Sequence, residues 1–253
     1  MTELFRLDGR VAIVTGASGG LGERMAHALA GAGATVVAAA RRLDKLEALV
    51  QQLPGSGHLA VQTDLQDSDQ VIALAATAAE KLGAIHVLVN NAGLHKPTPV
   101  AVESLDLYDQ TLGVNLRATY VLSREVAPHM AAAGGGSIVN IASAAAFVGN
   151  AKVPSAPYAA SKGGVVAMTR DLAAQWAADG IRVNAICPGW FRTDITAPML
   201  DSDKGKVFVS RQMPFARPGR LEEIDGPLLF LASEASSYVT GVALSVDGGL
   251  VAS

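Results

Sequence analysis

The stretch VAIVTGASGGLG, residues 11–22, joins a short apolar run to a turn rich in glycine. The apolar run predicts a buried strand, and Leu21, Met25 and Leu29 recur beyond the turn at the spacing of one helix face. Glycines at such a turn let the backbone approach a pyrophosphate, and the amino end of the following helix offers free N–H groups and a positive dipole. The turn therefore indicates a dinucleotide site, with a tight turn that binds no ligand as the alternative.

Outward from this stretch, short apolar runs alternate with longer segments of helical periodicity. The runs that predict strands are 11–14, 35–39, 59–61, 85–89, 137–141, 181–187 and 242–246. The helical segments include 104–129, 158–180 and 221–232. Strands that are continuously apolar are typical of a parallel sheet covered on both faces. We therefore predict a single α/β domain over 1–253, with a doubly wound, Rossmann-like parallel sheet of about seven strands.

The segment of about 190–218 interrupts this alternation directly after a predicted strand. It carries several large apolar residues, and ligands of open α/β sheets bind beyond the carboxyl ends of the strands. We interpret the segment as a substrate lid inserted over the site, which would exclude water on closing. Trp190 and Phe191 are accordingly expected to contact the substrate.

Composition excludes several other classes of protein. The formal net charge is −3 and no polybasic run is present, so neither nucleic acid nor an anionic membrane is an expected partner. The longest apolar run, 28–40, is shorter than the roughly 20 residues needed to span a bilayer, and 1–10 does not resemble a signal peptide. With Cys187 as the only cysteine, a cytoplasmic location is expected.

The glycine-rich turn and several later motifs together resemble the short-chain dehydrogenase/reductase family. The turn has the family's T-G-x-x-x-G-x-G spacing in place of the commoner G-x-G-x-x-G, 90–93 reads NNAG, and 246–249 reads VDGG. Pro188, Gly189 and Thr193 fit the family's P-G-x-x-x-T. The family's catalytic tetrad matches Asn115, Ser143, Tyr158 and Lys162 in order and approximate spacing. The resemblance covers nearly the whole chain and implies hydride transfer between a nicotinamide and a ketone or secondary alcohol.

Such a reaction needs a proton for the substrate oxygen, because the cofactor supplies only the hydride. A free tyrosine titrates near 10, and a neighbouring ammonium lowers that pKa. Tyr158 and Lys162 lie four residues apart on one predicted helix and share a face. Ser143, at a strand end, could hold the substrate oxygen within hydrogen-bond reach of the tyrosine. The resemblance further implies that Asn115 orders a relay water beside Lys162, and that Lys162 binds the nicotinamide ribose.

The end of the second strand favours NADP(H) over NAD(H). Arg41 and Arg42 stand where NAD enzymes usually place a carboxylate, and guanidinium groups suit the 2′-phosphate. The family's other NADP marker, a basic residue inside the turn, is replaced by Gly19. The resemblance implies that Asp64 contacts the adenine and Thr193 the carboxamide. The full set expected at the cofactor is Gly16, Ser18, Gly20, Leu21, Gly22, Arg41, Arg42, Asp64, Leu65, Asn91, Ala92, Gly93, Tyr158, Lys162, Pro188, Gly189 and Thr193.

Two other functions are weighed against this one. A non-catalytic nucleotide sensor would not need to keep the whole tetrad, and a 3-oxoacyl-(acyl-carrier-protein) reductase would need a basic patch for its acidic partner, which 127–136 does not offer. The five histidines lack ligand-like spacing, so no metal is expected. His95 could face the site, but a solvated loop position is the favoured interpretation.

The helix after Tyr158 indicates self-association. The face opposite to Tyr158 carries mainly small apolar residues where a monomer would be polar, and a helix apolar nearly all round is normally buried on both sides. We expect a homo-oligomer, most simply a tetramer, because family members commonly pair through this helix and its neighbour at 104–129.

Overall fold

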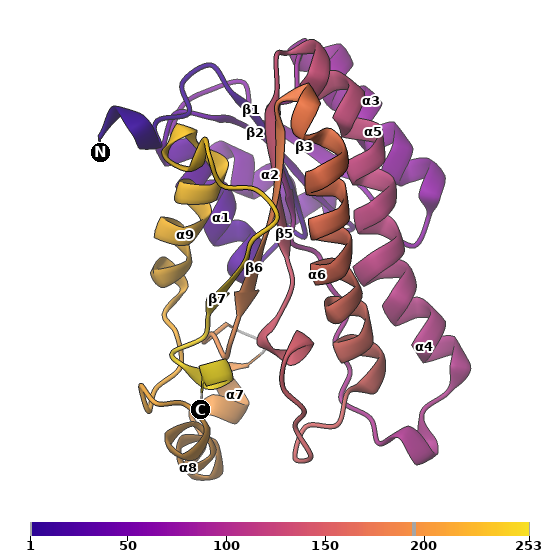
Figure 1. Cartoon of the computed structure of the whole chain (residues 1–253), viewed down its shortest axis with the longest axis vertical. Coiled ribbons are helices and arrows are strands. Elements are labelled where there is room, and N and C mark those ends of the chain that lie inside the picture. Colours follow the sequence, from indigo (N-terminus) through magenta and orange to yellow (C-terminus); the bar gives the residue numbers. More distant parts are fainter. Residues whose placement is uncertain (1, 194–195, 253) are drawn as a thin grey trace.

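The computed structural model describes residues 2–193 and 196–252. Its centre is one sheet in which all neighbouring strands run parallel, in the order β3-β2-β1-β4-β5-β6-β7 (Figure 1). The strands are β1 Val11–Thr15, β2 Thr35–Ala40, β3 Leu59–Gln62, β4 Val87–Asn90, β5 Gly136–Ile141, β6 Ile181–Pro188 and β7 Ala243–Val246. The strand order reverses between β1 and β4, and this is where open α/β sheets bind ligands. The predicted doubly wound sheet is confirmed.

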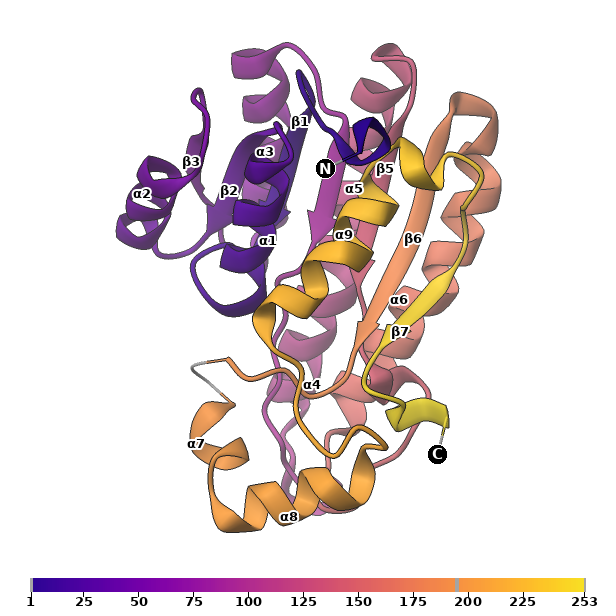
Figure 2. The ribbon, with the colours of Figure 1, turned by 90° about the vertical axis from the view of Figure 1, so that its left-hand side faces the viewer.

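Helices cover both faces of the sheet, which explains why its strands are apolar throughout (Figures 1 and 2). One face carries α1 Gly20–Gly31, α2 Leu43–Gln52 and α9 Asp225–Ala232, and the other carries α3 Ser68–Leu82, α5 Ala118–Ala132 and α6 Ala156–Trp176. Alternate residues of β1 supply both cores: Val14 packs with the first set of helices and Ile13 with the second.

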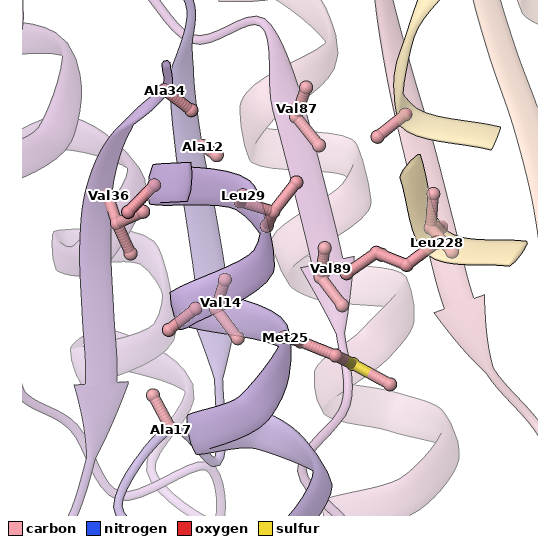
Figure 3. Packing of buried hydrophobic residues seen from close by; sticks show 14 of the residues in the cluster. Ala12, Val14, Ala17, Met25, Leu29, Ala34, Val36, Val87, Val89 and Leu228 are labelled. Carbon is pink, nitrogen blue, oxygen red and sulfur yellow. The ribbon is translucent and has the colours of Figure 1, made fainter. Parts of the chain in front are cut away.

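The core under α1 fixes the position of the glycine-rich turn. Met25 and Leu29 of α1 are fully buried and project towards Val14 of β1, Val89 of β4 and Leu228 of α9 (Figure 3). Burying a side chain of this size stabilises a fold by about 1.5–3 kcal/mol. The amino end of α1 is therefore held firmly at the carboxyl ends of β1 and β4.

The segment 104–129 is not the uninterrupted helix that its periodicity predicts. It forms α4 Leu105–Leu112 and α5, joined by a turn of π-helix over Gly113–Arg117. A π-turn inserts an extra residue and redirects the side chains within it. In this chain it carries Asn115, which is 1% exposed.

The segment after β6 forms α7 Ala197–Leu200 and α8 Asp203–Gln212, beyond the carboxyl ends of the strands (Figure 2). Leu200, Val209 and Met213 form a small core there, against which Trp190 and Phe208 pack. Residues 194 and 195 of the expected lid lie outside the described residues. Within the described part of the chain, no helix has both the length and the apolar character needed to cross a bilayer.

Candidate active site

A groove of about 900 Å³ lies beyond the carboxyl ends of the central strands. Its walls come from the glycine-rich turn, the ends of β2 and β3, and the loop after β4. The expected cofactor residues that line it are Gly16, Ser18, Gly20, Leu21, Gly22, Arg41, Arg42, Asp64, Leu65, Asn91, Ala92, Gly93 and Thr193. Segments far apart in the sequence are thus brought together as the motifs indicate.

The glycine-rich turn is packed too closely to accept side chains. A Cβ on Gly22 would lie 2.2 Å from the carbonyl oxygen of Gly16, and one on Gly16, whose φ is +68°, would lie 2.9 Å from Cα of Ala92. Thr15 and Asn91 hold the two loops together: Thr15 Oγ1 accepts the Asn91 N–H at 3.0 Å, and Asn91 Nδ2 donates to the Thr15 carbonyl at 2.9 Å. The backbone is therefore open to close approach by a pyrophosphate.

A guanidinium lies over this turn although no basic residue belongs to it. Arg42 Nη2 donates to the carbonyl oxygen of Ser18 at 2.8 Å and to its hydroxyl at 3.0 Å. The same nitrogen is 3.6 Å from where a Cβ of Gly19 would stand. Arg41 is exposed along the same wall. The end of β2 thus supplies the positive charge that the sequence of the turn lacks.

Asp64 lines the groove after β3 and also has a local role. Its Oδ1 accepts the N–H of Gln66 at 3.0 Å, and its own N–H donates to Gln70 Oε1 at 2.9 Å. This is the pattern of an Asx-turn. In this geometry Asp64 can be both a turn residue and a ligand contact.

The ends of β5 and α6 bring Ser143, Tyr158 and Lys162 together. The Ser143 and Tyr158 side chains are hydrogen-bonded. Lys162, which is 3% exposed, donates from Nζ to the Ile141 carbonyl at 2.6 Å and lies 5.7 Å from the centre of the Tyr158 ring. A proton-bearing phenol, a hydroxyl and a buried ammonium therefore share one corner.

Burial shifts the pKa values of both titratable groups in this corner. It lowers the pKa of the Lys162 ammonium to about 8. It also raises the pKa of the Tyr158 phenol, and the hydrogen bond from Ser143 only partly opposes that rise. The net shift of the Tyr158 pKa is therefore upward, opposite to the lowering that a neighbouring ammonium alone would give.

Asn115 anchors the loop after β4. Its Oδ1 accepts the Leu94 N–H at 2.7 Å, and its Nδ2 donates to the Leu94 carbonyl and to Ser161 Oγ, each at 3.0 Å. A Cβ on Gly93 would lie 3.6 Å from Asn115 Oδ1 and equally far from Lys162 Nζ. Asn115 therefore fixes this loop beside the lysine, in addition to any part it has in a proton relay.

The segment after β6 is divided between two cavities. Thr193 lines the groove, whereas Pro188 and Gly189 do not, and Gly189 packs so closely on Asp247 that a Cβ would lie 2.8 Å from its Cα. Trp190 and Phe191, expected at the substrate, line a second cavity of about 290 Å³. Phe191 is 5% exposed because its ring also packs into the core beneath α1 and α9.

His95, for which the sequence favours a solvated loop position, is exposed but also lies against Tyr158. Its ring lies 4.4 Å from the ring of Tyr158, centre to centre, at 40° between planes, so it is not a freely solvated loop side chain. Burial and the Lys162 charge lower the pKa of the His95 imidazole. Its place two residues after the NNAG turn is the signal in the sequence that it could face the site.

Lys162 predicts a rise in stability between pH 8 and pH 9. Its pKa is about 8 in the fold and about 10.5 in the unfolded chain, so the unfolded chain binds more protons in this window and the free energy of unfolding increases with pH. Wild type should gain about 1 kcal/mol relative to Lys162→Met between these two pH values, measured by urea unfolding.

Cys187 acts in the opposite sense above about pH 9, in wild type and Lys162→Met alike, so the comparison is made below that pH. Burial raises the pKa of its thiol from 9 to about 11, so the unfolded chain loses that proton first and the contribution of Cys187 to stability falls between these two values. If the free energy of unfolding changes equally with pH in wild type and Lys162→Met between pH 8 and pH 9, the lowered pKa of Lys162 is contradicted.

Comparisons with known proteins agree with this arrangement. The family model for enoyl-(acyl carrier protein) reductase matches residues 16–251. The chain is 38% identical to the 2-dehydro-3-deoxy-D-gluconate 5-dehydrogenase of Escherichia coli, over 98% of each chain. It is 37% identical to a 3-oxoacyl-(acyl-carrier-protein) reductase of Thermotoga maritima, over 97% of this chain and 99% of that one. A gluconate 5-dehydrogenase from Burkholderia cenocepacia, solved with NADP and tartrate, superposes with a TM-score of 0.92 at 35% identity, over 99% of this chain and 98% of that one.

Proposed function

The chain belongs to the short-chain dehydrogenase/reductase family, and from this premise we propose that its substrates are polyhydroxylated ketones or the matching alcohols, of the sugar-acid type. It is an oxidoreductase that uses NADP(H) and acts on a CH–OH group or the corresponding ketone. The observation that carries the proposal is the corner formed by Ser143, Tyr158 and Lys162, which does not itself line the groove but adjoins it at Gly93, where a Cβ would lie 3.6 Å from Lys162 Nζ.

The residues present fit a bound NADP(H). The turn at Gly16 and Gly22 leaves its backbone bare for the pyrophosphate, and Arg41 and Arg42 lie where a 2′-phosphate needs positive charge. Thr193, whose Cγ2 lies 3.5 Å from where a Cβ of Gly20 would stand, suits the carboxamide. When bound, the cofactor supplies or accepts the hydride.

In the proposed mechanism, the side chains of this chain move the proton and hold the substrate oxygen. Tyr158 donates its phenolic proton to that oxygen in reduction, and Ser143 holds the oxygen within reach. The Lys162 ammonium stabilises the phenolate that remains and contacts the nicotinamide ribose. Asn115 keeps the loop at Gly93 and Leu94 in place and orders the water that returns the proton. In this proposal the described parts of the segment after β6, 190–193 and 196–218, act as the lid over the site.

A spectrophotometric panel tests the substrate class. Keto sugar acids, keto polyols, simple ketones and an acyl-carrier thioester would be supplied with NADPH, and its oxidation followed. We expect turnover of the polyhydroxylated ketones, as the names of two relatives suggest. Preference for the thioester would instead favour a 3-oxoacyl-(acyl-carrier-protein) reductase, which is the activity named for the Thermotoga relative. Failure of every ketone would refute the proposal.

We also propose that the protein forms a homotetramer in the cytoplasm. Ala160, Ala167 and Ala174 are exposed on the outer face of α6. On the neighbouring α4, Leu105 is 79% exposed. Adjacent apolar helix faces of this kind suit a contact across a two-fold axis. The lone, buried Cys187 suits a reducing compartment.

Ala167→Arg should break this assembly, because the two-fold axis would bring like charges together in a desolvated contact. Sedimentation velocity would show wild type as a tetramer and the variant as a smaller species. Lys81→Arg, on α3 and outside this face, is the matched control and should leave the tetramer intact. A monomeric wild type would end the proposal.

A further inference from the structure

Two hydrogen bonds between loops hold His95 against Tyr158, the proposed proton donor. Its Nε2 is 2.8 Å from the hydroxyl of Ser155, just before α6, and the N–H of Thr98 donates to the Pro154 carbonyl at 2.9 Å. These bonds fasten the loop after β4 to the segment that leads into Tyr158. The imidazole therefore has a fixed place beside the tyrosine ring, 4.4 Å away, while part of its surface stays exposed.

The hydrogen bonds of Ser155 favour one of the two tautomers of His95. When the Ser155 hydroxyl donates its single proton to the Val153 carbonyl, 3.0 Å away, its oxygen accepts from His95 Nε2. In the neutral ring Nδ1 is then a bare acceptor. Burial and the nearby Lys162 both lower the pKa of this imidazole and so favour its neutral form. No residue in the described parts of the chain hydrogen-bonds Nδ1.

We propose that His95 is a specificity-determining residue whose Nδ1 accepts a hydrogen bond from a substrate hydroxyl close to the reacting carbon. The inference deepens the proposed function and rests on it. A ring beside Tyr158 lies within the span of a small substrate whose oxygen meets the tyrosine hydroxyl. A neutral acceptor suits a hydroxyl, which can donate, and does not suit a carboxylate, which only accepts.

The expected discrimination is that of one neutral hydrogen bond. Such a bond contributes about 3- to 10-fold in affinity, and a substrate without the hydroxyl does not gain it. Loss of the His95 acceptor should change the ratio of kcat/KM between substrates with and without the hydroxyl. It should not slow all substrates, because the proton still comes from Tyr158. A merely structural role for His95 would slow all substrates alike.

The test compares cyclohexanone with 2-hydroxycyclohexanone, which differ by one hydroxyl beside the carbonyl. Wild type should show a higher kcat/KM for the hydroxyketone with NADPH. His95→Phe keeps a ring against Tyr158 but removes the acceptor, so the preference should fall about 3- to 10-fold, mainly through KM. Lys96→Ala, an exposed neighbour in the same loop, should keep the wild-type preference.

Two results would overturn the inference alone: a wild type that turns over both ketones without preference, or a His95→Phe variant that loses activity equally on both. NADPH titration by fluorescence checks that the variant still folds and binds its cofactor. His95→Gln keeps a hydrogen-bond acceptor, so it should recover part of the preference for the hydroxyketone. A wild type that binds NADPH and reduces no ketone would overturn the proposed function together with this inference.

Discussion

Tyr158→Phe is expected to lower kcat by about 10²- to 10⁴-fold while NADPH binding stays nearly unchanged. The substitution removes only the phenolic hydroxyl, together with its hydrogen bond to Ser143. The ring contact with His95 is kept, and the bond from Lys162 to the Ile141 carbonyl does not involve the tyrosine. The cofactor groove should therefore keep its shape, and the loss should appear in turnover.

The measurement pairs steady-state kcat with a fluorescence titration of NADPH. Tyr238→Phe is the matched control, since Tyr238 is fully exposed and the same hydroxyl is removed far from the groove. It should behave as wild type. Near-normal kcat for Tyr158→Phe would mean that another group donates the proton. A parallel loss of NADPH binding would mean that the hydroxyl supports the groove instead.

The fold could be predicted from sequence because its signals are local. The strand at 11–14 and the turn that follows it depend on apolar runs and glycine positions, which neighbouring residues determine. The break in the helix at Gly113–Arg117 could not be predicted, because a π-turn depends on tertiary contacts such as those of Asn115 with Leu94 and Ser161. Periodicity across 104–129 carried no trace of it.

The candidate site, like the fold, could be predicted from sequence only in part. The family's motifs indicated which residues gather at the groove, but not how each is oriented. The place of His95 against Tyr158 depends on Ser155, which is 60 residues away in sequence. The direction of the Tyr158 pKa shift depends on burial by the whole fold, whereas the spacing of Tyr158 and Lys162 reports only their proximity.

Arg42 shows why a motif judged by its own residues can mislead. The turn holds Gly19 where a basic residue marks NADP enzymes of the family, yet the Arg42 guanidinium reaches across from the end of β2 to Ser18. A small residue at position 19 leaves room for that approach. Arg42 uses one nitrogen for both bonds to Ser18, and the remaining N–H groups of the guanidinium can meet a 2′-phosphate.

Arg42→Asp should therefore lower kcat/KM for NADPH by about 10- to 100-fold, the contribution of one hydrogen-bonded charge, while NADH is used equally well or better. A carboxylate at this strand end can accept from the ribose hydroxyls of NAD(H), so the preference should narrow or reverse. Arg41→Asp, on the same wall but not bonded to Ser18, should act in the same direction. Lys81→Asp makes an identical change of charge at the carboxyl end of α3 and should leave both values unchanged. If Arg42→Asp lowers kcat/KM equally for NADPH and NADH, Arg42 only stabilises the turn through Ser18. A wild type that prefers NADH would contradict the assignment of Arg41 and Arg42 to the 2′-phosphate.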